Sequence, residues 1–200
     1  MLSGPTVSIG PLVPDDFLPI FHWSNDVEAS RLNASYRPVD WVSHRAWCDS
    51  VGQDPSRVVF AIRRHNDPKI VGYVEIIHIN PTHRSAQLGI RIGAAADRGQ
   101  GLGKEALRIA LHYSWNHLNL NRVSLTTLRH NERAIRAFTA AGFRREGTLR
   151  RAEFIDGAWV DLVMMAALRP SRHAEPFPVQ TATVEVRRKG RLGAFQRNTK

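Results

Sequence analysis

A glycine-rich turn between a strand and a helix constrains this chain more than any other feature of its sequence. The segment from Arg98 to Lys104, Arg-Gly-Gln-Gly-Leu-Gly-Lys, holds three glycines in five positions between a strand-like segment and a helical pattern. Glycine permits a tight turn and lets a ligand approach the backbone closely. The free N–H groups and the dipole of the following helix favour an anion. The turn therefore predicts a phosphate site, with glycines needed for geometry alone as the alternative.

The spacing of these glycines excludes two common phosphate-binding motifs. A P-loop needs Gly-Lys-Ser/Thr after a four-residue spacer, and that arrangement is absent from the turn. The dinucleotide fingerprint Gly-x-Gly-x-x-Gly is absent as well. The ligand class must therefore come from the rest of the chain.

Length and composition indicate one domain without disulfides. A chain of 200 residues is the usual size of a single domain, and at this length no disulfide or metal is needed for stability. The single cysteine, Cys48, excludes an internal disulfide framework and a Cys-rich metal cluster. The longest apolar run, 162–168, is far shorter than the roughly 20 residues of a membrane span. The first thirty residues hold no Lys or Arg, so we expect no signal peptide, no membrane contact and a cytoplasmic protein.

Positive charge is concentrated at the C-terminal end. Residues 171–200 carry seven basic and two acidic side chains, a net charge of +5, which is half of the formal +10 of the chain. Such a tail is typical of a solvated, partly disordered end. It would also suit an anionic partner such as nucleic acid or the phosphates of a ligand. No nucleic-acid-binding motif accompanies the charge, so nucleic acid stays open as a partner without support.

Hydrophobic periodicity predicts an α+β fold with an antiparallel sheet and one strand–helix–strand crossover. We expect the domain to span residues 1–170 and a basic tail to span 171–200, partly disordered or with an edge strand at 181–186. The predicted strands are 7–12, 58–63, 70–79, 86–92, 122–128, 143–154 and 159–168, and the predicted helices are 14–23, one from near Ser43, 101–118 and 132–141.

Several motifs resemble the GNAT superfamily of N-acetyltransferases. Arg98-x-x-Gly101-x-Gly103 resembles its acetyl-CoA pyrophosphate signature, and the helix that opens at Asn131 and ends in Gly-Phe resembles its second motif. Further segments resemble the RimJ/RimL-type branch, which includes ribosomal-protein and amino-sugar acetyltransferases; these are 23–25, 43–47, 146–150 and 156–161. The resemblance covers roughly residues 5–168 and leaves the tail out.

This resemblance implies a twisted, mostly antiparallel sheet of about seven strands with about four helices. It also implies a splay between the fourth and fifth strands, where the pantetheine arm of acetyl-CoA lies like an added strand. Asn131 would contact the CoA arm, cap its helix, or do both. No metal is implied. The cofactor contacts implied in this chain are Ile90, Arg91, Ile92, Arg98, Gly99, Gln100, Gly101, Leu102, Gly103, Lys104, Asn131 and Phe138.

The catalytic groups depart from the family pattern. An alkylammonium pKa near 10 calls for a general base at neutral pH. Family members often place a Glu before the phosphate turn and a Tyr in the second-motif helix, but Gln87 and Phe138 occupy those positions here. Glu75 lies mid-strand, where an unpaired buried carboxylate would be unfavourable. We predict a catalytic or substrate-amine role for Glu75, with a structural ion pair as the alternative.

Other titratable residues are weaker candidates for catalysis. His78 on the same strand is more typical of a structural residue, Glu146 suits the surface as well as the splay, and Tyr113 fits the core. The acceptor site should be roofed by the first two helices and their connection. Among the residues there, Asn25 and Tyr36 are predicted to bind substrate, whereas aromatic side chains at helical spacing are more typical of core.

The sequence thus predicts an acetyl-CoA-dependent N-acetyltransferase. A primary amine of an amino sugar, a polyamine or a protein N-terminus would attack the thioester directly. Two alternatives stay open: a catalytically weak acyl-CoA-binding protein, suggested by Gln87 and Phe138, and a basic RNA-associated acetyltransferase, suggested by the charge. The resemblance also leaves a homodimer open.

Overall fold

Strands and helices follow one another in the predicted order in a computed structural model that describes residues 1–32, 36–170 and 178–181. The strands are β1 (Leu2–Ser3), β2 (Val7–Gly10), β3 (Val58–Arg64), β4 (Ile70–Asn80), β5 (Ser85–Ile92), β6 (Arg122–Leu128), β7 (Arg144–Ile155), β8 (Ala158–Leu168) and β9 (Gln180–Thr181). The α-helices are α1 (Phe17–Ser24), α2 (Val27–Ser30), α3 (Trp41–Ser50), α4 (Leu102–Asn116) and α5 (Glu132–Ala141), with short 3-10 turns at Pro14–Asp16 and Ala95–Asp97. Within the described ranges, seven strands have four residues or more and four α-helices have eight or more, as predicted.

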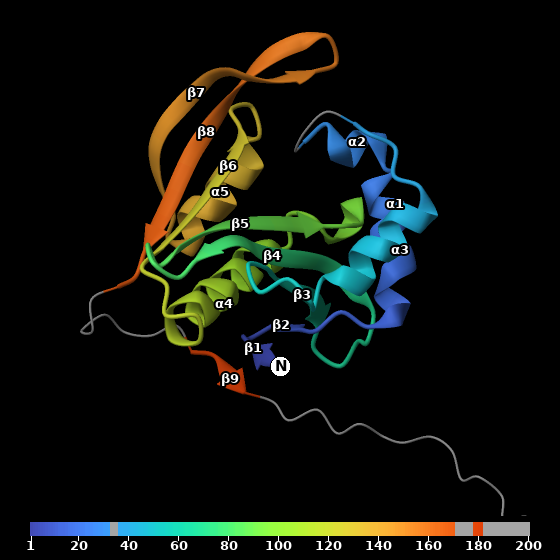
Figure 1. Cartoon of the computed structure of the whole chain (residues 1–200), viewed down its shortest axis with the longest axis vertical. Coiled ribbons are helices and arrows are strands. Elements are labelled where there is room, and N and C mark those ends of the chain that lie inside the picture. Colours follow the sequence, from blue (N-terminus) through green and yellow to red (C-terminus); the bar gives the residue numbers. More distant parts are fainter. Residues whose placement is uncertain (33–35, 171–177, 182–200) are drawn as a thin grey trace, which may run out of the picture.

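The nine strands of the described residues form one sheet in the order β7-β8-β6-β5-β4-β3-β2-β1-β9 (Figure 1). Every neighbouring pair is antiparallel except β5 and β6, which are parallel and joined through α4. This confirms the mostly antiparallel α+β fold and its single crossover. The parallel pair is joined only from Ser85–Arg122 to Gln87–Ser124, and beyond that register the two strands diverge. The divergence is the predicted splay, because β5 and β6 are the fourth and fifth of the longer strands.

Several boundaries differ from the prediction for local reasons. Strand β2 stops at Gly10, before Pro11, which has no N–H for a ladder bond. Helix α3 begins at Trp41 because the Asp40 side chain caps it, accepting a bond from the Ser43 N–H at 2.9 Å. The sequence pattern missed two of the shortest elements, β1 and α2, which hold two and four residues.

Only a small part of the tail belongs to the described chain. Gln180 and Thr181 form β9 and pair with Ser3 and Leu2 at the edge of the sheet. The predicted edge strand at 181–186 therefore begins there, but residues 182–186 lie outside the described residues, as do 171–177 and 187–200. The division into a domain and a basic tail stays a prediction.

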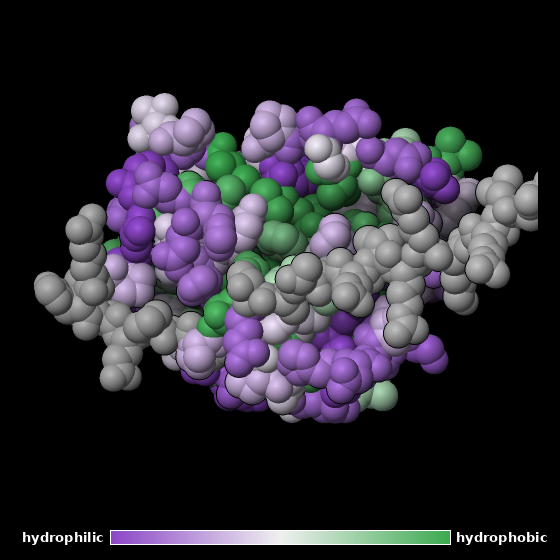
Figure 2. Space-filling view, turned by 90° about the horizontal axis from the view of Figure 1, so that it is seen from below, coloured by the Kyte–Doolittle hydropathy of each residue, from purple (hydrophilic) through white to green (hydrophobic). Residues whose placement is uncertain are grey.

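Each face of the sheet carries its own hydrophobic cluster. On one face, Val74 and Ile76 of β4 belong to the large cluster that includes Leu107 of α4. On the other face, Tyr73 packs on a smaller cluster around Ile20 of α1. Helices α1 to α3 gather beside one end of the sheet, while the β7–β8 hairpin extends beyond the body (Figure 1). In a view from below, hydrophobic residues gather centrally and hydrophilic residues surround them (Figure 2). No helix in the described ranges is long and apolar enough to cross a membrane.

Glu105 of α4 joins this helix to the N-terminal end of the sheet. Its carboxylate accepts bonds from the N–H groups of Thr6 and Val7 at 2.7 and 2.9 Å, and from the Thr6 hydroxyl. Burial alone would raise the pKa of Glu105, but the hydrogen bonds from Thr6 and Val7 outweigh it and lower that pKa. The ionised form therefore stabilises the packing of α4 against β2.

Replacing Glu105 with Ala should reduce the free energy of unfolding by about 1.5 to 3 kcal/mol, because two backbone donors lose a charged acceptor. The lowered pKa makes this contribution present above the ordinary carboxyl pKa and absent once pH falls through the folded-state value. Urea unfolding at neutral and acidic pH measures both effects. The control is Glu132→Ala, which removes only an exposed pair with Arg136 and should change stability little. Equal losses in the two variants would contradict the role of Glu105.

Candidate functional site

A cleft of about 540 Å³ lies where β5 and β6 diverge. One wall is the edge of β5 from Leu88 to Ile92, and the other includes Thr126 and Thr127 of β6. Neither stretch is paired across the gap, so backbone N–H and C=O groups of both strands are left available to an extended ligand. The turn before α4 and one side of α5 complete the lining.

The backbone of the glycine-rich turn is arranged to receive an anion. Gly99 and Gly101 have φ angles of +80° and +83°, which glycine adopts without strain. None of the N–H groups of residues 99–104 is bonded to an acceptor in the described part of the chain. They lie at the positive end of the 15-residue helix α4, beside the Lys104 side chain that lines the cleft. The predicted phosphate site is thus a set of unused donors at a helix N-terminus.

Side chains hold the turn from both ends. The Arg98 guanidinium donates to the carbonyl oxygens of Ile92 at 3.2 Å and Gly93 at 2.5 Å. Arg64 donates to Asp97 and to Gln100 at 2.9 and 2.8 Å. Arg98 lines the cleft while also bracing the turn against β5. Of the predicted cofactor residues, Gln100 and Leu102 do not line the cleft: Gln100 faces Arg64, and the Leu102 side chain is buried in the core.

Helix α5 brings polar and basic groups to the opposite side. The Asn131 side chain caps α5 by accepting from the Ala134 N–H at 3.2 Å and donates to the Leu32 carbonyl at 3.0 Å. Both Asn131 and Phe138 line the cleft, so the N-cap role does not remove Asn131 from the site. Arg133 and Arg136 line it as well, one turn of helix apart. With Lys104 on the side of the turn, they add three positive charges to the lining of the cleft.

Glu75 reaches the cleft across a glycine. Glu75 of β4 is the direct neighbour of Gly89 in β5, and a Cβ at position 89 would lie only 2.9 Å from the carboxylate Oε1. The missing side chain therefore lets the carboxylate lie over β5 and line the cleft. The Glu75 carboxylate makes no hydrogen bond or ion pair with another residue that the structure describes.

The pKa of Glu75 is raised, because burial outweighs the opposing charges of Arg57, Arg91 and His78. A half-buried, unpaired carboxylate at a cleft is suited to accept a proton. The alternative of a structural ion pair finds no partner within 4.0 Å among the described residues.

The other side chains considered for catalysis have structural partners or lie outside the cleft. Gln87 is exposed, and its amide oxygen lies 3.2 Å from Nδ1 of His78. Glu146 forms an ion pair with Arg122, and the hydrogen bond from Arg122 lowers the pKa of Glu146. Tyr113 packs edge-on against Phe60 and stacks on His117, away from the cleft lining.

Neither predicted substrate residue lines the cleft. The Asn25 amide donates to the carbonyls of Phe21 and Val39 and accepts from the Val39 N–H at 2.9 Å, so it joins α1 to the segment before α3. Tyr36 is 39% exposed and absent from the cleft lining. Their substrate roles stay predictions, without support from this geometry.

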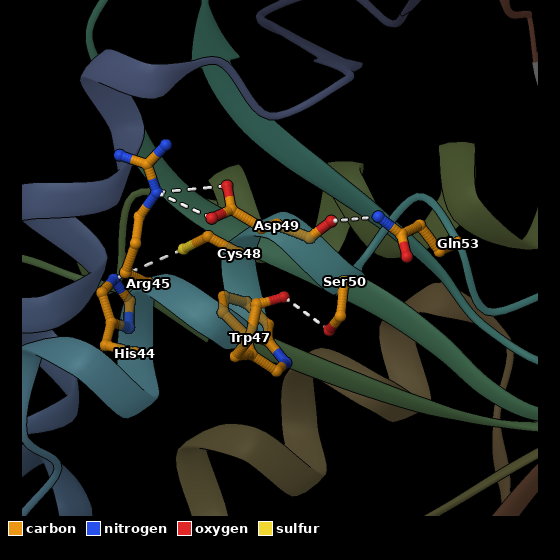
Figure 3. A network of polar contacts seen from close by, with 7 residues as sticks. All are labelled: His44, Arg45, Trp47, Cys48, Asp49, Ser50 and Gln53. Carbon is orange, nitrogen blue, oxygen red and sulfur yellow. Dashed lines mark hydrogen bonds and ion pairs between the residues drawn. The ribbon is translucent and has the colours of Figure 1, made fainter.

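Helix α3 is anchored rather than open to the cleft. The buried His44 donates from Nε2 to the Phe17 carbonyl at 2.8 Å and lies 3.5 Å from Cys48 Sγ. Figure 3 shows these two side chains together, with Arg45 directed toward Asp49. Trp47 packs against His44 and Tyr73. The ring of Trp23 lies against Gly93, and a Cβ at position 93 would come within 1.9 Å of that ring. The backbone carbonyl of Trp23 accepts a hydrogen bond from Arg91. These contacts agree with the prediction that the aromatic side chains of the first helices are packing residues rather than substrate contacts.

Sequence reasoning missed several residues that line the cleft. Tyr73 is one of them: it shares a face of β4 with the predicted Glu75, and their i, i+2 spacing was a signal for it. Arg133 and Arg136 share a face of α5 by their i, i+3 spacing. Ala29 and Leu32 carried no signal, because they reach the cleft only through the packing of α2. No cluster of three metal-ligating side chains occurs among the described residues.

Comparison with known proteins places these features in a family. Residues 7–144 match the model of the acetyltransferase (GNAT) domain. The spermidine N(1)-acetyltransferase of Escherichia coli is 28% identical over 175 residues, which are 88% of this chain and 92% of that protein. The [ribosomal protein uS5]-alanine N-acetyltransferase of Escherichia coli is 25% identical over 150 residues, 74% of this chain and 77% of that one.

Solved structures agree with the sequence relatives. The crystal structure of spermidine N-acetyltransferase from Vibrio cholerae, in complex with CoA and spermine, superimposes with a TM-score of 0.76. It is 26% identical and covers 81% of this chain and 95% of that one. The family model covers more than half of this chain, including the glycine-rich turn, the splay and α5. The chain therefore belongs to the GNAT family and is an N-acetyltransferase.

Proposed function

We propose that this protein transfers the acetyl group of acetyl-CoA to a primary amine of a polyamine such as spermidine. The observation that carries the proposal is the unpaired Glu75 carboxylate, which lies over Gly89 and lines the cleft. A carboxylate there both attracts an ammonium group and accepts a proton from it. The names of the relatives supply the polyamine, since two proteins that cover most of this chain are spermidine acetyltransferases.

The donor half of the cleft suits CoA. The N–H groups of residues 99–104 would bind the pyrophosphate, with Lys104 beside them. The unpaired edge of β5 from Leu88 to Ile92 would pair with the pantetheine arm as an added strand does. Arg133 and Arg136 would serve the remaining phosphate. Arg98 would act mainly by holding the turn against β5.

The reaction then needs one base and a direct attack. The amine nitrogen bonds to the thioester carbon, the C–S bond breaks, and its electron pair stays on sulfur. A protonated primary amine has three N–H bonds and its amide has one, so two protons leave the nitrogen. One passes through Glu75 to solvent, and the other ends on the sulfur of released CoA. The raised pKa of Glu75 makes its carboxylate a better proton acceptor than an ordinary one.

A protein N-terminus is the second acceptor class that an observation favours. The alanine N-acetyltransferase relative covers 74% of this chain, and Arg91 places a positive charge beside Glu75. A guanidinium next to the base suits a peptide carbonyl better than the second ammonium of a polyamine. The two acceptors must therefore be compared directly.

Release of the CoA thiol from acetyl-CoA tests the proposal with spermidine, an Ala-starting peptide and glucosamine in parallel. The expected result is amine-dependent release with spermidine as the best acceptor, and mass spectrometry of the product should show one added acetyl group. Best turnover on the peptide would replace the polyamine with a protein N-terminus. Tight CoA binding without turnover on any amine would show a catalytically weak acyl-CoA-binding protein. RNA affinity that falls steeply with salt would support the RNA-associated alternative.

A further inference from the structure

Tyr73 is the second chemically active side chain that the acceptor side of the cleft offers. It precedes Glu75 by two positions on β4, so the two side chains share a face of the sheet. Both line the cleft. Their Cα atoms are about 6.7 Å apart at the usual rise of a strand, a span that accommodates one tetrahedral carbon and its substituents between the side chains.

The Tyr73 hydroxyl has no hydrogen-bond partner among the residues that the structure describes. A half-buried tyrosine hydroxyl usually finds a partner, so a ligand or water in the cleft is expected to provide it. The ring itself is held: it contacts the indole of Trp47 at a centroid distance of 6.3 Å and packs on the cluster around Ile20. Arg91, directly opposite on β5, is occupied by the Trp23 carbonyl. The ring of Tyr73 is therefore fixed by packing, while its hydroxyl group is free to donate a hydrogen bond.

The Tyr73 hydroxyl could replace a hydrogen-bond donor that this chain lacks at position 138. Phe138 stands where the family often has a tyrosine, and its ring packs against Phe143 and carries no O–H group. The free N–H groups on the β5 edge can serve the thioester carbonyl oxygen. The sulfur then needs a donor of its own. Charge develops on that sulfur as the C–S bond breaks, and a fixed donor nearby stabilises it.

We propose that Tyr73 is a catalytic residue whose hydroxyl donates a hydrogen bond to the departing CoA sulfur, in place of the tyrosine that Phe138 replaces. The inference rests on the proposed acetyl transfer. The nitrogen–carbon bond forms and the C–S bond breaks as described, and Tyr73 keeps its proton throughout. Burial raises the pKa of Tyr73, so the hydroxyl stays protonated at neutral pH. A thiol pKa of about 8.5 lets the sulfur leave as a hydrogen-bonded thiolate, which then takes up the second amine proton and is released as the thiol.

The test compares Tyr73→Phe with the wild type in kcat, in KM for acetyl-CoA and in CoA affinity by calorimetry. Phe keeps the contacts with Trp47 and removes only the hydroxyl. We expect kcat to fall about 10-fold to 100-fold, as for the loss of one transition-state donor, while KM and CoA affinity change less than about twofold. The matched control is Tyr113→Phe on α4, which lies outside the cleft lining and should keep wild-type kinetics.

The outcomes separate this inference from the proposed function. An unchanged kcat in Tyr73→Phe, with active wild-type protein, would overturn the role of Tyr73 and leave the acetyltransferase intact. A parallel loss of CoA affinity would also overturn it, because the ring would then be structural. A wild type without turnover on any amine would end both proposals.

Discussion

Replacing Glu75 with Gln should lower kcat for amine acetylation by about 100-fold or more, the usual contribution of a general base. The carboxylate is the one acidic group that reaches the acceptor side of the cleft without a partner among the described residues, since Asp97, the other acid in the lining, is paired with Arg64. Gln has nearly the same shape but cannot accept a proton. CoA affinity should stay within about twofold, because Glu75 lies apart from the phosphate turn. The rate of CoA thiol release at saturating substrates gives kcat, and isothermal titration calorimetry gives the affinity for CoA.

The substitution Gly89→Ala tests the Glu75 carboxylate by displacing it. The added Cβ would lie 2.9 Å from Glu75 Oε1, the far end of a flexible side chain, so the carboxylate must move while the strand stays in place. We expect kcat to fall about tenfold or more through misplacement of the base. Gly52→Ala is the control, because a Cβ there meets no atom within 4 Å. Wild-type activity in both Glu75→Gln and Gly89→Ala would refute a catalytic carboxylate at this position.

Gly101→Val should weaken CoA binding by about 10-fold to 100-fold. Gly101 caps α4 with a φ of +83°, a conformation that is strained by about 1 to 3 kcal/mol for other residues and most strongly for β-branched ones. The free protein can relieve this strain by opening the turn, and CoA binding must then restore it. The N–H groups of residues 99–104 lose their common direction in the relaxed turn.

Calorimetric titration with CoA measures this loss, and the thermal midpoint shows whether the fold survives. Gly52→Val is the matched control, since position 52 has no positive φ and open space around its Cα. It should bind CoA like the wild type. Equal affinity in Gly101→Val would mean that the turn does not hold the phosphates and that the glycines serve geometry alone.

The fold was predictable from the sequence because its longer elements have strong periodicity. The alternating pattern of β4 and the apolar stripe of α4 place the sheet and its covering helix correctly. The elements that the sequence missed, β1 and α2, have two and four residues, too few for any period to appear. Their positions depend on packing, as when the Leu32 carbonyl accepts a bond from Asn131.

The site was predictable where local backbone chemistry defines it. The turn conformation of the glycines and the helix cap at Asn131 can be predicted from the residue types and their spacing alone. The acceptor side was harder, because it depends on which residues face each other across two strands. Nothing in the sequence shows that Gly89 leaves room for Glu75, and Asn25 is used in an internal contact that only the tertiary structure reveals.

The pH dependence of acetyl transfer at saturating acetyl-CoA and amine tests the central claim, that Glu75 is the base, most directly. The base must be ionised, and burial raises the pKa of Glu75 above the ordinary carboxyl value despite Arg57, Arg91 and His78. Activity of the wild type should therefore rise as pH increases through that raised pKa, and rise further as the acceptor amine loses its proton. In Glu75→Gln the lower of these two steps should vanish and leave only the amine step. A Glu75→Gln profile with the same two steps and the same rates as the wild type would contradict the account.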